Sequence, residues 1–392
     1  MDTGSNVILF PSKYYRSRFP KMTILDNHLD GDLQKFLYPL NMMENVIFLS
    51  KYSIRDNFIT SNNSYASFYS YCSTFVFIAI YIFLIFFYQN VTKFAPDLLV
   101  IAVILYVIVI TGIILYNFTN NGYSDSHVNL IISIQRLKRF LKIENNERFI
   151  IRSWILFFII YIYYVLLLII QAYAGRFNPL IILSYFILFV HDVKMLYLIQ
   201  INKLLLECTI MYESKLKVAN EIDSNMDRVN IGRLREEFWN TTVKSFLELS
   251  NATRTYKHLS EVSMFYRMIF MVIYSLSYVE IIILLQSTPD NMYFALFLCW
   301  LFKTAGLVGI ICFNSEYLLI MLKNIQATIL VNMITENNLE LHSMYKVLKQ
   351  EIAVACEEMS TSGIQRLDAT LPLTLLSVFA TYTVVLLQFA FL

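Results

Sequence analysis

Seven long apolar stretches constrain the fold of this chain more than any other feature of its sequence. A helix needs about 20 apolar residues to cross the hydrocarbon core of a bilayer. Stretches of this length occur at residues 66–88, 95–117, 151–173, 179–201, 263–285, 292–313 and 369–392. Apolar residues make up 57% of the 392 positions and charged residues only 15%, which is unlike a soluble domain, and the stretches are too long for barrel strands. The sequence therefore predicts an all-α integral membrane protein with seven transmembrane helices.

Lysine and arginine are distributed unevenly between the segments that connect these stretches. One side of the membrane would hold 26 of the 31 basic residues, in segments 1–65, 118–150 with Arg152, 202–262 and 314–368. The loops on the other side hold only Lys93 and Arg176. Because basic loops stay in the cytoplasm, we expect a cytoplasmic N-terminus and an extracellular C-terminus. The polar N-terminus has no apolar core with a cleavage site, so we expect no cleaved signal peptide.

The cytoplasmic segments are expected to be helical as well. Residues 202–262 contain no Pro, and their apolar side chains recur near helical spacing at Trp239, Val243, Phe246, Leu249, Tyr256 and Leu259. Residues 314–362 lack both Gly and Pro and are predicted to continue the sixth membrane helix. The apolar stripes need a partner, either within one subunit or between subunits, and both alternatives stay open.

These observations divide the chain into four regions. Residues 1–65 form a cytoplasmic N-terminal segment, and residues 66–313 hold transmembrane helices one to six with the intervening cytoplasmic helices. Residues 314–368 form cytoplasmic anchor helices. Residues 369–392 form the seventh helix, which we expect to line a pore for the reasons given below.

The sequence motifs of common enzymes are absent. There is no Gly-rich phosphate loop, no HExxH, no Gly-x-Ser-x-Gly and no paired Cys/His cluster, and the five histidines are scattered. We therefore expect no enzymatic activity, no catalytic residue, no metal site and no cofactor. The net charge of +2 gives no reason to expect nucleic acid as a partner.

The last apolar stretch carries polar residues near its end. On a helix, Thr381, Val385 and Gln388 share one face at i, i+4 and i+7, and Tyr382 and Phe389 form an adjoining stripe. An amide facing lipid is costly. We expect Gln388 either to hydrogen-bond with another helix or to line a water-filled pore, in which Phe389 or Val385 forms an apolar constriction.

The C-terminal segment resembles that of the insect gustatory receptors. The residues that carry the resemblance are Ser362-Gly363-Ile364, Leu367-Asp368, Thr381-Tyr382 and Gln388-Phe389. Upstream, residues 249–256 are similar to the cytoplasmic helix that precedes the fifth span in that family. The residue-level match is confined to these positions, whereas the match in topology extends over the whole chain.

The resemblance implies a ligand-gated, non-selective cation channel in the plasma membrane. It would be a tetramer of this chain, or of this chain with other gustatory receptors, in contact with permeant cations and membrane lipid. The seventh helix would line the central pore with Gln388 and Phe389 near the gate, and a small-molecule tastant would bind each subunit from outside. Sugar-receptor members commonly carry Glu where this chain has Thr383, so a bitter-type or orphan receptor is implied. Gln365 and Arg366 also depart from the bulkier apolar residues of the family.

Aromatic and polar residues in the outer halves of the spans are the candidates for ligand binding, since aromatic walls with few polar groups suit small amphipathic ligands. The candidates are Gln171, Tyr185, Tyr274, Tyr278, Glu280 and Trp300. For Glu280 we favour an ion pair with Lys303 on the sixth span over ligand contact.

Polar and charged residues also lie within the fourth and fifth spans. His191, Asp192 and Lys194 of the fourth span are expected to form a structural polar network, in which Asp192 and Lys194 neutralise each other or partners on other helices. The long side chain of Arg267 is expected to extend its charged group to the cytoplasmic interface.

Other classes of seven-helix membrane protein are alternatives. A G-protein-coupled receptor would place its N-terminus outside, and its Asp-Arg-Tyr triplet after the third span is missing here. A transporter is less favoured because the sequence has no internal repeat. A membrane protein with a purely structural role is the third alternative.

Overall fold

The computed structural model describes residues 27–46, 49–92, 96–143, 147–173, 179–225, 231–284, 291–335, 339–356, 360–361 and 365–391. Seven of its helices are long and apolar enough to cross a membrane. They are α3 (Ser64–Thr92), α4 (Pro96–Gly122), α6 (Glu147–Tyr173), α7 (Pro179–Asn225), α8 (Ile231–Leu284), α9 (Asn291–Thr335) and α11 (Leu371–Phe391). Each contains most of one predicted stretch, so the prediction of an all-α protein with seven transmembrane helices is confirmed.

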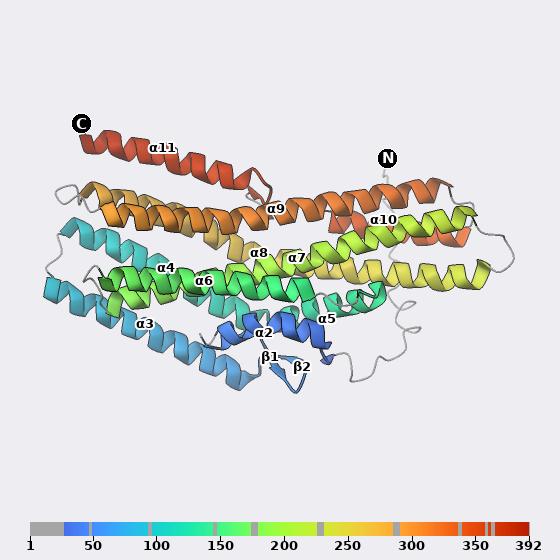
Figure 1. Cartoon of the computed structure of the whole chain (residues 1–392), viewed down its shortest axis with the longest axis horizontal. Helices are drawn as coiled ribbons and strands as arrows, with labels where there is room; N and C mark the ends of the chain where they lie inside the picture. The colour runs from blue at the N-terminus through green and yellow to red at the C-terminus, as the bar shows by residue number, and fades with distance from the viewer. Residues whose placement is uncertain are drawn as a thin grey trace, which may run out of the picture.

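Three of these helices extend well beyond the length that a membrane requires. α7, α8 and α9 contain 47, 54 and 45 residues, and a helix of such length spans roughly 70 Å. Their extensions run alongside α10 (Leu339–Ala355) at one end of the molecule (Figure 1). The predicted continuation of the sixth membrane helix over 314–362 is correct only in part, because α9 ends at Thr335 and α10 begins at Leu339.

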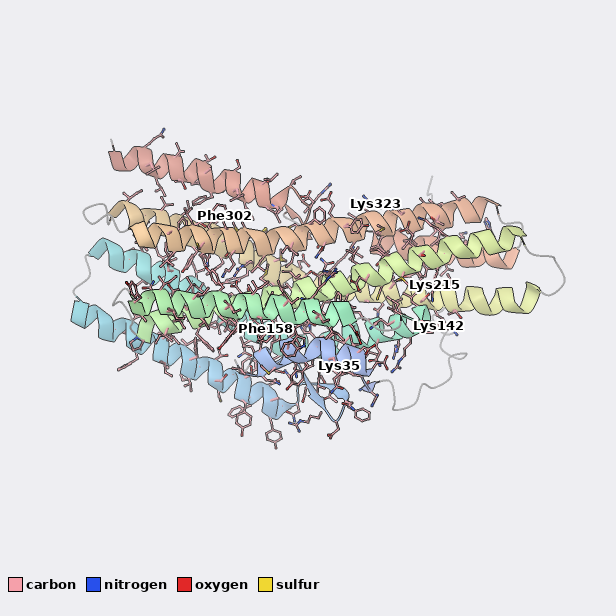
Figure 2. All side chains as sticks on the ribbon, viewed as in Figure 1. Lys35, Lys142, Phe158, Lys215, Phe302 and Lys323 are labelled. Carbon is pink, nitrogen blue, oxygen red and sulfur yellow. The ribbon has the colours of Figure 1, made fainter. Side chains whose placement is uncertain are left out.

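Exposed phenylalanines lie on the half of the molecule away from the helical extensions. Figure 2 shows Lys142, Lys215 and Lys323 toward the end that holds the extensions, and Phe158 and Phe302 toward the opposite end. These two phenylalanines are 50% and 72% exposed. This half contains the membrane-spanning parts of the seven helices, where lipid would cover the exposed rings.

The apolar stripe of the cytoplasmic segments packs within this chain. Phe246, Leu249 and Tyr256 of α8 are buried, and the ring centroids of Tyr212 and Phe246 lie 5.7 Å apart. The hydroxyl of Tyr256 donates a hydrogen bond of 3.2 Å to the Leu198 carbonyl of α7. Of the two partners that the sequence left open for this stripe, the structure shows the one inside the same subunit.

The N-terminal segment folds into a helix and a hairpin that the sequence did not predict. They are α2 (Gly31–Val46) and the antiparallel pair β1 (Tyr52–Arg55) and β2 (Phe58–Ser61). The two turn residues, Asp56 and Asn57, have positive φ angles of 51° and 67°, as a tight two-residue hairpin loop requires. α2 packs against α6 and α7, and α5 (Ser124–Leu141) packs against the hairpin.

The start of α11 is fixed by hydrogen bonds. It follows a short antiparallel pair, β3 (Ser360–Thr361) and β4 (Gln365–Arg366). The Asp368 carboxylate accepts hydrogen bonds from the N–H groups of Thr370 at 3.1 Å and Leu371 at 3.2 Å, which caps the helix. Glu316 of α9 accepts a hydrogen bond of 2.9 Å from the Ala369 N–H. Beyond this attachment α11 lies at the edge of the bundle (Figure 1).

The close approach of α4, α7 and α8 depends on Gly112. A methyl group added at Gly112 would lie 2.2 Å from the hydroxyl oxygen of Tyr266 and 2.4 Å from Cε1 of His191. The Tyr266 hydroxyl is itself held by a hydrogen bond of 2.8 Å to the Ile108 carbonyl. The position therefore has no room for a side chain.

We expect Gly112→Ala to lower the free energy of unfolding by roughly 1–3 kcal/mol, because the methyl group must displace packed side chains. The measurement is the thermal unfolding midpoint of the purified protein in detergent. Gly306→Ala is the matched control, since no described atom lies within 4 Å of its added methyl group and alanine favours a helix. Equal midpoints for the two variants would show that this contact is not tight.

Candidate functional site

A cluster of charged side chains lies inside the bundle where α6, α7, α8 and α9 meet. Asp192 of α7 forms ion pairs with Arg267 of α8, at 2.8 Å, and with Lys303 of α9. Tyr164 of α6 donates a hydrogen bond of 2.6 Å to the same carboxylate and accepts one of 2.9 Å from Lys303. Asp192 and Arg267 are 0% and 1% exposed. One buried carboxylate thus connects four membrane helices.

Three expectations from the sequence are corrected by this cluster. Lys303 pairs with Asp192 and not with Glu280, which is exposed. Lys194 does not neutralise Asp192, because it donates a hydrogen bond of 2.6 Å to Asn120. Arg267 does not reach the cytoplasmic interface, since it is buried against Asp192. The alternative expectation, that Asp192 has partners on other helices, is confirmed.

The cluster contains more positive than negative charge. Two cations share the carboxylate of Asp192, and an uncompensated charge in apolar surroundings costs several kcal/mol. Aromatic rings lie beside both cations: Arg267 is 5.6 Å from the ring centroid of Phe270, and Lys303 is 4.8 Å from those of Tyr163 and Tyr164. The electron-rich faces of these rings stabilise the excess positive charge.

Three of the six candidate ligand-binding residues come together beside the charged cluster. The ring of Tyr274 lies 4.3 Å from that of Trp300 and 5.0 Å from that of Tyr278. The ring centroids of Trp300 and Phe270 are 6.1 Å apart. Phe270 lies one helical turn from Arg267 on α8, and Trp300 lies one turn from Lys303 on α9. We call Phe270, Tyr274, Tyr278, Phe297 and Trp300 the aromatic cluster.

The remaining candidates are placed differently. Gln171 of α6 is buried and donates a hydrogen bond of 3.0 Å to the hydroxyl of Tyr185 of α7. Glu280 lies near the end of α8 and is exposed. Their roles in ligand binding stay predictions.

One residue of the site was not singled out from the sequence. Tyr164 supplies a hydroxyl to Asp192, and its position in an aromatic-rich helix gives no signal of this role. His191, which the sequence groups with Asp192 in a polar network, stacks on Phe270 with ring centroids 5.0 Å apart.

A second polar network joins the N-terminal segment to the bundle. The buried side chains of Lys51 and Glu44 form an ion pair. The amino group of Lys51 lies 3.7 Å from the ring centroid of Tyr197, whose hydroxyl is 3.2 Å from Nδ1 of His127. Burial, helped by the nearby charges of Lys194 and Lys51, lowers the pKa of His127 well below its ordinary value. His127 is therefore a neutral structural group near pH 7.

Four of the predicted pore residues of α11 are exposed. Leu371 and Leu375 are buried where the start of α11 packs against α8 and α9. Thr381, Val385 and Gln388 are exposed along one side of the helix, whereas Tyr382 is exposed although it follows Leu375 by two turns on the same side. The side chain of Phe389 lies outside the described residues. Their role in a pore stays a prediction, since a single chain cannot close a ring.

Comparison with models of known protein families found no match, and comparison with curated proteins found none either. Among the described residues, no three His, Cys, Asp or Glu side chains are grouped as a metal site would require. The arrangement of the chain supports the general class of a seven-helix, multi-pass membrane protein.

The excess of positive charge predicts unequal effects of two substitutions. Asp192→Asn leaves two buried cations without a counterion, and we expect it to cost roughly 3–5 kcal/mol of stability. Lys303→Gln leaves a balanced Asp192–Arg267 pair, so its cost should be clearly smaller. The measurement is the fraction of each variant that remains monodisperse after heating in detergent. A Lys303→Gln protein as unstable as Asp192→Asn would contradict the proposed charge balance.

Proposed function

We propose that this chain is a subunit of a ligand-gated, non-selective cation channel of the plasma membrane, similar to the insect gustatory receptors and opened by a small extracellular tastant. The observation that carries the proposal is the exposed amide of Gln388 on α11. Only 11% of the membrane-spanning part of α11 is buried, which is the smallest share among the seven described spans.

An exposed amide in a membrane helix requires either water or a hydrogen-bonding partner, because lipid offers neither. α11 packs against α8 and α9, and its half-buried residues Phe379, Thr383 and Leu386 lie on the side of the helix opposite the exposed Gln388. These contacts support a partner for Gln388 on a neighbouring subunit. Several α11 helices arranged about an axis would supply water and neighbouring amides together. Thr381 and Val385 would then face the same axis, and Val385 or Phe389 would form an apolar constriction that closes by dewetting.

The aromatic cluster offers a route from a bound ligand to α11. The ring of Phe297 stacks on Tyr278 with centroids 5.0 Å apart and lies 6.2 Å from the ring of Phe379 on α11. A small amphipathic ligand that separates Tyr278 from Phe297 would move the contact surface of α11. Such a ligand opens the pore only to the extent that it binds the open state more tightly than the closed one.

The resemblance of the C-terminal segment supports the same function. Leu367 is buried and Asp368 caps α11, so two of the residues that carry the resemblance hold the start of the proposed pore helix. Thr383, in place of the acidic residue of sugar receptors, favours a bitter-type or orphan receptor over a sugar receptor.

We predict that Gln388→Ala changes cation selectivity or basal leak and that Phe389→Ala raises leak, because they remove the polar ring and the apolar constriction. The measurement is whole-cell recording from cells expressing this chain alone, with G-protein signalling blocked, during perfusion with sugars and bitter compounds. Phe158→Ala is the matched control, since Phe158 is an exposed ring on α6. Unchanged currents in well-expressed Gln388→Ala and Phe389→Ala variants would refute the pore assignment, and currents that disappear under the block would favour a G-protein-coupled receptor.

A further inference from the structure

A polar cleft opens where the N-terminal segment meets the start of α3. Its volume is about 340 Å³, which falls within the range of small-ligand sites. The polar residues that line it include Asn45, Ser53, Arg55, Asn62, Tyr69 and Ser70. The cleft is thus built from α2, the hairpin and α3 together.

Arg55 supplies the one formal charge of the cleft lining, which contains no carboxylate. Its side chain is exposed, and none of the ion pairs formed among the described residues includes it. A guanidinium group presents several N–H donors in a planar fork that fits a phosphate in bidentate fashion. The one cation of the lining therefore favours an anion, and the planar fork of its guanidinium group fits a phosphate.

The hydrogen bonds of the lining residues separate a structural floor from an accessible rim. On the floor, Ser70 donates a hydrogen bond of 2.9 Å to Asn117, and Asn62 donates one of 2.7 Å to the Ser50 carbonyl. On the rim, Tyr69 is 68% exposed and belongs to the same lining as Arg55, so its hydroxyl is a further donor. Neutral donors around a cation are the usual surroundings of a bound phosphate.

The cleft lies at the level of the membrane surface. The membrane-spanning part of α3 begins at Ser64, between the lining residues Asn62 and Ala66. The first turns of α3 expose Tyr65, Phe68, Tyr69 and Tyr71, and aromatic side chains of this kind mark the boundary between lipid and water.

Further along α3, apolar side chains are exposed where lipid chains would run. Val76 and Ile80, which follow Tyr69 by two and three turns on the same side of the helix, are 54% and 49% exposed. A lipid whose acyl chains follow this side of α3 would bring its headgroup to the cleft. The combination of an apolar track and a cationic polar pocket distinguishes a phospholipid from a soluble ligand.

We propose that this cleft binds the phosphate group of an anionic phospholipid, with Arg55 as its principal ligand and Ser53, Asn45 and Tyr69 as further donors. The site is on the side that the basic residues assign to the cytoplasm, where anionic lipids are concentrated. A bound headgroup joins α2 and the hairpin to α3 and so stabilises the N-terminal segment on the bundle. The proposal is independent of the pore.

The test is a titration of the purified full chain in detergent with a fluorescent phosphatidic acid, with phosphatidylcholine as the zwitterionic comparison. We expect the wild type to bind phosphatidic acid more tightly, and we expect Arg55→Gln to weaken this binding about fivefold. Lys35→Gln is the matched control, because Lys35 is an exposed cation of α2 outside the cleft lining (Figure 2). Equal losses in the two variants, or no preference for phosphatidic acid, would overturn the proposal.

Two further measurements identify the source of the phosphate and control for misfolding of the variants. Inorganic phosphate at millimolar concentration should leave lipid binding unchanged, and full displacement would assign the cleft to a soluble phosphate instead of a lipid. Tyr69→Phe removes one donor without removing charge, so it should weaken binding less than Arg55→Gln while the thermal unfolding midpoint stays the same. Unchanged affinity in both folded variants would show that the lipid binds elsewhere.

Discussion

The carboxylate of Asp192 is the group on which the arrangement of the membrane helices depends. It receives Arg267 from α8, Lys303 from α9 and the hydroxyl of Tyr164 from α6. In apolar surroundings, a charge that loses its partner has no water to replace it. Rotation or sliding of one of these helices would therefore leave an unpaired charge. Phe270 follows Arg267 by one turn on α8, and Trp300 precedes Lys303 by one turn on α9. The charged cluster therefore also fixes the position of the aromatic cluster.

The number, type and approximate limits of the membrane helices could be predicted from the sequence, because apolar length alone determines them. The partners of the charged residues could not, since pairing depends on how helices far apart in sequence are rotated. One error was avoidable: Asp192 and Lys194 are two residues apart and face nearly opposite sides of a helix. The helix α2 could have been predicted in part, since Leu33, Phe36, Leu37 and Leu40 recur at helical spacing, but Pro39 inside the helix argues against it.

For the candidate site, the sequence predicts which residues share a side of one helix, but not which residues of two helices meet. The exposed side of α11 follows from helical spacing within one segment, so Thr381, Val385 and Gln388 could be grouped from the sequence. Tyr274 and Tyr278 lie one turn apart on α8, but their contact with Trp300 of α9 depends on the packing of two helices. A sequence with 27 tyrosines does not reveal which of them meet a tryptophan.

One amide of α4 connects α7 to the N-terminal segment. Asn120 accepts the hydrogen bond of Lys194 through its oxygen and donates one of 2.8 Å to the Leu49 carbonyl through its nitrogen. An amide can bridge in this way because it has a donor and an acceptor on opposite sides. Leu49 lies between the ion-paired residues Glu44 and Lys51 of the N-terminal segment. The N-terminal segment is therefore part of the same hydrogen-bonded unit as α4 and α7, and a displacement of α7 that moves Lys194 must also disturb the segment that forms the polar cleft.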